Sequence, residues 1–119
     1  MRIGRCRSGR RCFDWLVACR ARPTLEKLAM FQFAGETQSC DGFETLIALA
    51  ADVDPETADL YRSAILPDER RHAAIGRRAL TLLCATPQEQ ARARAACQEM
   101  NERVFGAYRA HRARVDARA

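Results

Sequence analysis

A break between two long helix-forming segments falls at residues 52–55, which read Asp52-Val53-Asp54-Pro55. Proline suits the first position of a helix, so a helix is expected to begin at Pro55. Apolar residues recur at helical spacing on both sides of the break. Because short connections join antiparallel neighbours in helical proteins, the sequence predicts a long antiparallel helical hairpin.

Two carboxylates lie at nearly equal distances from this turn. Glu69 is 16 residues after Val53, and Glu36 is 17 residues before it. At about 1.5 Å of rise per residue, these separations are roughly 24 and 25 Å, so the two side chains should meet at one level. By the same rise, Glu44 would fall short by roughly 10 Å and Glu26 would overshoot by roughly 16 Å. Both of these are predicted to be surface carboxylates.

His72 follows Glu69 by three residues, a spacing that places both side chains on one helix face. A Glu-x-x-His unit joined by a lone Glu from a neighbouring helix is the ligand pattern of di-iron and di-manganese helical bundles. Iron(II) and manganese(II) suit such mixed carboxylate and imidazole ligands. The sequence therefore predicts Glu36, Glu69 and His72 as metal ligands. The alternative is a solvated Glu69–His72 pair on an arginine-rich helix, with Glu36 an ordinary surface residue.

The predicted fold is all-α, a long antiparallel hairpin followed by a C-terminal helix. Thr24 and Thr86 are expected to be N-caps, each beside a proline. The three helices are predicted over residues 24–51, 55–84 and 87–114. With 119 residues and 48% hydrophobic residues, the chain has room for one domain at most.

Two residues near the predicted site disfavour a regular helix. Pro67 removes a backbone hydrogen bond two residues before Glu69, which predicts a kink or a bulge there. Such irregularities concentrate at functional sites, although a proline in a surface turn of a helix is equally compatible with the sequence. Gly76 costs about 1 kcal/mol relative to alanine in a helix. Close helix approach or room for a ligand would explain it.

Charge separates residues 1–22 from the rest of the chain. This segment carries seven arginines against Asp14, a net charge of +6, which leaves a net charge of −1 on residues 23–119. A nucleic-acid partner is therefore not expected, and no apolar run is long enough to predict a membrane span. Residues 1–22 are predicted to be a poorly ordered arginine-rich leader with one or two helical turns around Phe13 to Cys19. Its charge bias is that of an organellar transit peptide, although a misplaced start codon would give a similar stretch.

The hydrophobic residues of the leader, Trp15, Leu16 and Cys19, could dock on the helices. Six cysteines occur without a C-x-x-C pair or zinc-finger spacing. Those inside predicted helices, Cys40, Cys84 and Cys97, are expected to be small buried groups. A reducing cytoplasm is the simplest compartment for such a chain.

Two stretches carry a resemblance to a known group of proteins: Phe31-Gln32-Phe33-Ala34-Gly35-Glu36-Thr37-Gln38-Ser39-Cys40-Asp41-Gly42-Phe43-Glu44 and Ile65-Leu66-Pro67-Asp68-Glu69-Arg70-Arg71-His72-Ala73-Ala74-Ile75-Gly76. Together they resemble the second helix pair of the ferritin-like superfamily, over about residues 25–84. The hydroxylase and rubrerythrin-like branches are the most similar, including tRNA-modifying hydroxylases with a similar Ser-Cys after the lone Glu. The resemblance implies that residues 23–119 are half of a four-helix bundle with iron, or manganese, bound by Glu36, Glu69 and His72.

The chain departs from that family because the first helix pair and its ligands are missing. Asp14 is the only acid before Glu26, and no histidine precedes His72. A complete site needs four Glu and two His. Either the chain is a truncated copy that binds metal poorly, or two chains in a homodimer each supply half of the ligands.

Three functions follow from these alternatives. The first is an O₂-dependent oxidoreductase or hydroxylase acting on a small-molecule substrate, with a metal site completed by dimerisation. The second is a ferroxidase or iron-storage-like protein. The third is a metal-free helical interaction module without catalysis.

Overall fold

The structure, a computed structural model, describes residues 7–117, and this range contains helices and no strand. The first of its three long helices begins at Thr24. It consists of three consecutive segments, α2 (Thr24–Lys27), the π-helical η2 (Leu28–Gly35) and α3 (Glu36–Ala50). The helix begins at the predicted residue, but its N-cap is Pro23 and no side chain caps it. The prediction that Thr24 is the N-cap is wrong because Thr24 already lies inside the helix.

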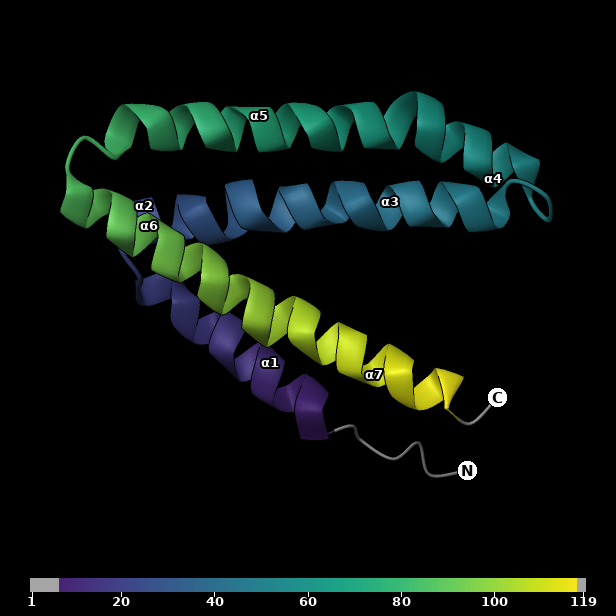
Figure 1. Cartoon of the computed structure of the whole chain (residues 1–119), viewed down its shortest axis with the longest axis horizontal. Coiled ribbons are helices and arrows are strands. Elements are labelled where there is room, and N and C mark those ends of the chain that lie inside the picture. The colour runs from purple at the N-terminus through teal and green to yellow at the C-terminus, as the bar shows by residue number, and fades with distance from the viewer. Residues whose placement is uncertain (1–6, 118–119) are drawn as a thin grey trace.

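The second long helix returns antiparallel to the first (Figure 1). Its segments are α4 (Pro55–Leu60), the π-helical η3 (Tyr61–Ile65) and α5 (Leu66–Leu83). Asp54 caps it by accepting a hydrogen bond from the backbone N–H of Thr57 at 3.1 Å. The predicted hairpin and its turn are therefore confirmed.

The third long helix consists of α6 (Pro87–Met100), the π-helical η4 (Asn101–Phe105) and α7 (Gly106–Asp116). Thr86 is its N-cap as predicted, and Glu89 completes a reciprocal capping box at 2.9 and 3.2 Å. In Figure 1 this helix begins against α2 and diverges from α3 toward the C-terminus. The all-α fold and its C-terminal helix are confirmed.

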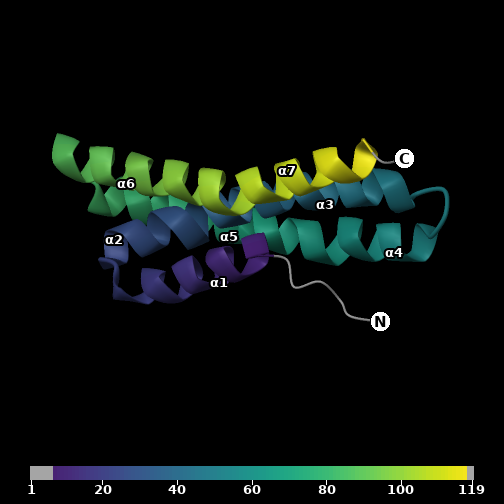
Figure 2. The same cartoon turned by 90° about the horizontal axis from the view of Figure 1, so that it is seen from below.

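The leader forms more structure than the one or two turns expected. Helix α1 (Arg7–Ala18) continues into a 3₁₀ turn, η1 (Cys19–Ala21). In Figure 2, α1 runs antiparallel to α6, with α2 between them. The indole Nε1 of Trp15 donates to Glu99 at 2.7 Å, and Arg22 pairs with Glu99 at 2.6 Å. These contacts attach the end of the leader to α6. Residues 1–6 of the predicted leader lie outside the described range.

The core gathers where the first and third helices meet the end of the leader. Its buried members are mostly small: Cys19, Ala29, Met30, Ala34, Ala93, Ala96 and Met100. Trp15 packs against this cluster, so the predicted docking of Trp15 and Cys19 is confirmed. Cys40, Cys84 and Cys97 are half-buried rather than buried. Across residues 7–117, no helix combines the length and apolarity that a membrane crossing requires.

Candidate metal centre

Glu36, Glu69 and His72 meet between the two arms of the hairpin. One potential ligand atom from each residue lies within 4.8 Å of the others, and this is the only cluster of three such residues in the described part of the chain. His72 Nδ1 lies 3.9 Å from Glu36 Oε1. The prediction that Glu36 and Glu69 meet at one level of the hairpin is therefore confirmed.

The second helix is irregular just before these ligands. In η3, the N–H of Leu66 bonds to the carbonyl of Tyr61, five residues back, instead of four. The next residue is Pro67, which has no N–H, so the local ladder is already interrupted there. The bulge predicted from Pro67 is present as a π-turn, a feature that is frequent at functional sites. It fixes the rotation with which α5 presents Glu69 and His72.

Gly76 brings the two helices together one turn beyond His72. A Cβ atom at Gly76 would overlap the carbonyl oxygen of Gln32 and lie 3.0 Å from the backbone nitrogen of Phe33. The same contact is reinforced by the Gln32 side chain, whose Nε2 donates to the carbonyl of His72 at 3.1 Å. Of the two explanations offered by the sequence, close helix approach is therefore the one observed.

The carboxylates of the cluster interact strongly. A hydrogen bond with the Glu69 carboxyl, burial and the negative charge of Glu69 raise the pKa of Glu36 to about 7, against the opposing charge of His72. Burial, followed by the charge of Glu69, also raises the pKa of the nearby Cys40 thiol. Two carboxylates held this close favour either a shared proton or a cation.

Asp68 contacts the other side of the His72 ring. Its Oδ2 lies 3.6 Å from His72 Nε2, and its Oδ1 accepts a hydrogen bond from Arg71 at 3.0 Å. A carboxylate at this position favours a proton on Nε2, which leaves Nδ1, the nitrogen facing Glu36, free to bind a metal. This contact between Asp68 and His72 was not among the predictions, although their i, i+4 spacing in the sequence indicates it.

The remaining carboxylates of the hairpin lie away from the cluster. Glu44 is exposed and pairs with Arg70 at 2.6 Å. Glu26 pairs with Arg92 at 3.1 Å and with Arg22 at 3.5 Å, and these partners leave its side chain only 19% exposed. Neither reaches the ligand cluster, as the helix arithmetic predicted, but only Glu44 is the surface carboxylate expected, since Glu26 is half-buried.

The donor set fits a transition metal. Metal bonds of about 2.1 Å to nitrogen and oxygen bring two donors of one ion to within about 4 Å of each other, so the observed spacing requires only small side-chain rotations. The side chains of Glu36 and His72 are 26% and 42% exposed, so the cluster opens to the surface on one side. A cation could enter without rearrangement of the helices.

Comparison of the chain with protein-family models, with curated proteins and with solved structures finds no match. The assignment of the cluster therefore rests on its own geometry and chemistry.

Proposed function

We propose that this chain binds iron, or manganese, through Glu36, Glu69 and His72, as half of a dinuclear carboxylate centre of the ferritin-like type. The observation that carries the proposal is the cluster itself. Two antiparallel helices bring two carboxylates and an imidazole within 4.8 Å, at the i, i+3 spacing used by metal-binding bundles. Carboxylate and imidazole donors favour iron and manganese over metals that prefer thiolate ligands.

The residues have separate parts in this proposal. Glu36, whose pKa is raised to about 7, would give up its proton on metal entry, while Asp68 keeps the imidazole of His72 oriented. When bound, a pair of iron ions would supply the reduction of O₂ and, with it, the oxidation of a small-molecule substrate. We therefore propose an O₂-dependent oxidoreductase.

A second copy of the chain is expected to complete the centre. Three ligands are half of the set that two metal ions require in such bundles. On α5, Ile75 lies one turn after His72, and Leu82 lies about 15 Å from His72 along the helix, on the same side as Ile75. They are 60% and 71% exposed. The radius of gyration is 16.8 Å, whereas about 13 Å is typical of a compact 100-residue domain. An open, apolar helix face next to an incomplete site supports a two-fold dimer.

Anaerobic loading with Fe(II) tests the proposal. We expect about one iron per chain and a dimer in solution. Glu69→Ala should lose the iron, whereas the matched control Glu44→Ala, which removes an exposed carboxylate of the same hairpin, should retain it. Ile75→Arg should give a folded monomer with weakened iron binding. A chain that binds no iron, with Glu69→Ala indistinguishable from wild type, would instead indicate the metal-free interaction module.

Exposure of the loaded protein to air separates the two metal-dependent functions. Oxygen uptake that scales only with added Fe(II) and leaves ferric mineral indicates a ferroxidase. Oxygen uptake that requires reductant and turns over many times per iron indicates an oxidoreductase, as proposed.

A further inference from the structure

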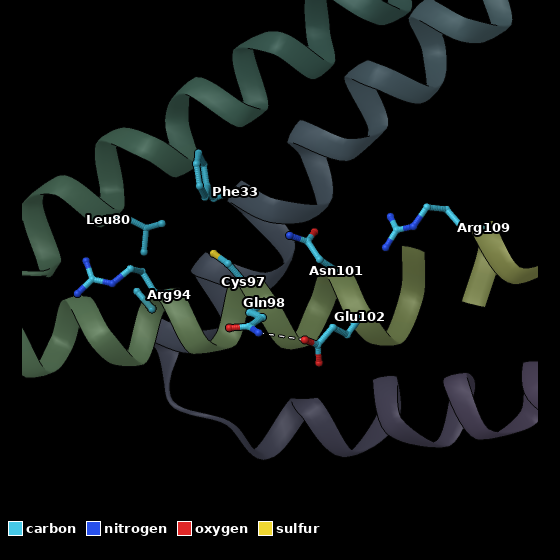
Figure 3. Close-up of a pocket in the computed structure, with 9 residues that line it drawn as sticks. Phe33, Leu80, Arg94, Cys97, Gln98, Asn101, Glu102 and Arg109 are labelled. Atoms are coloured by element: carbon cyan, nitrogen blue, oxygen red, sulfur yellow. Dashed lines mark hydrogen bonds between the residues drawn. The ribbon is translucent and has the colours of Figure 1, made fainter. Parts of the chain in front are cut away.

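A cavity of about 430 Å³ lies between the three long helices, on the side of η2 that faces α6. Its wall is largely apolar, with Phe33 from the first helix, Leu80 from the second, and Ala93 and Cys97 from the third. Figure 3 shows Phe33, Leu80 and Cys97 around one space. The volume falls within the range of pockets that bind small molecules.

One polar atom in this wall has no partner. The side-chain oxygen Oδ1 of Asn101 is buried and accepts no hydrogen bond, the one such side-chain atom found among the residues described. Buried acceptors are normally paired, because leaving one unpaired after desolvation is costly. Because less than 1 Å² of this atom is exposed, a donor in the cavity would satisfy it once the Asn101 side chain turns toward the cavity.

Two cations border the same space. Arg94 and Arg109 both line the cavity, and within the described range neither guanidinium has an ion-pair partner. In Figure 3 the Arg109 side chain extends from α7 toward Asn101. The cavity's carboxylate, Glu102, accepts a hydrogen bond from Gln98 at 3.0 Å. The cavity therefore carries a net positive charge beside an unpaired acceptor.

We infer that this cavity binds a small amphipathic carboxylic acid that also carries an N–H or O–H donor. The carboxylate pairs with Arg109, the donor bonds to Asn101 Oδ1, and the apolar body packs on Phe33 and Leu80. Guanidinium–carboxylate pairs are strong and directional, and the apolar part of the wall favours a ligand with an apolar body over a purely ionic one such as phosphate. The site shares no residue with the metal cluster, so it does not depend on the proposed metal chemistry.

Titration of the full-length, metal-free protein with indole-3-acetate tests this inference. The probe combines an aromatic body, an N–H donor and a carboxylate. We expect saturable binding by calorimetry, with affinity about tenfold lower for its methyl ester, which lacks the charge, and for its N-methyl derivative, which lacks the donor. Absence of saturable binding, or equal affinity for all three compounds, overturns the inference.

Variants assign the two contacts. Arg109→Gln should weaken indole-3-acetate binding about tenfold without changing the weaker binding of the methyl ester. Arg114→Gln, an exposed arginine of the same helix that does not line the cavity, should bind like wild type. Asn101→Leu should weaken binding and raise the melting temperature, because it removes a buried unpaired acceptor. Equal effects of the two arginine variants overturn the inference. Arg109 is exposed, so its variant should fold, and the comparison of the arginine variants can be made even if Asn101→Leu does not fold.

Discussion

The two ends of the hairpin differ in how completely they are packed. At one end, here called the packed end, η2 meets α6 and η1 and buries Met30, Ala96 and Cys19 to 2% exposure or less. At the other, the open end formed by α3 and α4, Leu49 and Val53 are 63% and 83% exposed. Two helices alone cannot cover each other's apolar sides, and the third helix has diverged before it reaches this end (Figure 1).

The metal cluster lies at the boundary between these ends. Glu36 is the first residue after η2, which belongs to the packed end, and it also begins α3, which leads to the open end. Contact between Gly76 and Gln32 fixes the helices on the packed side of the cluster. The difference teaches that a site can be positioned by packing on one side and remain open to a partner on the other.

Truncation of Met30, at the packed end, should give the largest loss of stability among these predictions. Met30→Ala removes a fully buried side chain and should lower the free energy of unfolding by about 2–5 kcal/mol. Leu49→Ala, at the open end, should change it by less than about 0.5 kcal/mol in the monomer. Urea unfolding followed by circular dichroism measures both. Similar losses would show that the two ends are equally packed.

The contact beside the metal cluster can be tested with two matched glycine substitutions. Gly76→Ala should destabilise by about 1–3 kcal/mol, because the added Cβ overlaps the backbone of Gln32. Gly42→Ala introduces the same methyl group in α3, where nothing lies within 4 Å, and should stabilise by about 0.5–1 kcal/mol. Thermal unfolding gives the sign of each change. A stabilising Gly76→Ala would rule out the close approach.

Attachment of the leader to the packed end depends on Glu99. Burial alone would raise the pKa of this carboxyl, but hydrogen bonds from Trp15 and Arg22, together with the charges of Arg22 and Arg103, lower it overall. Glu99→Leu should cost about 1–2 kcal/mol and shift the fluorescence of Trp15, the chain's single tryptophan, toward that of exposed indole. Glu56→Gln, at the open end, should leave the emission unchanged. Unchanged emission in Glu99→Leu would show that α1 is held by other contacts.

The last prediction concerns the pH dependence of stability. Because the pKa of Glu36 is raised to about 7 from an ordinary 4.5, the folded protein binds more protons than the unfolded chain between these values. Its contribution to stability is complete below about pH 4.5 and is lost as the pH rises through 7. Metal-free protein should therefore melt at a lower temperature at pH 8 than at pH 5. Glu36→Gln should reduce this difference in melting temperature. An undiminished difference in the variant would show that other groups cause the pH dependence.

Much of the fold followed from local signals in the sequence. Asp54-Pro55 and Thr86-Pro87 marked helix starts that the structure confirms, because capping and proline geometry act within one turn. The cap predicted at Thr24 is one residue too late, because the observed N-cap is Pro23. Helix α1 is longer than predicted, since its contact with Glu99 comes from far along the chain. Asp68 was not assigned its contact with His72, although the spacing was visible.

The sequence by itself determined the three helices, their order, and the common level of Glu36, Glu69 and His72, because helix rise and turn position are local properties. Only the tertiary structure decided which side of each helix is covered. The divergence of the third helix, the close approach at Gly76 and the unpaired oxygen of Asn101 arise from packing between distant segments. Local periodicity identifies an apolar face but does not say what will cover it.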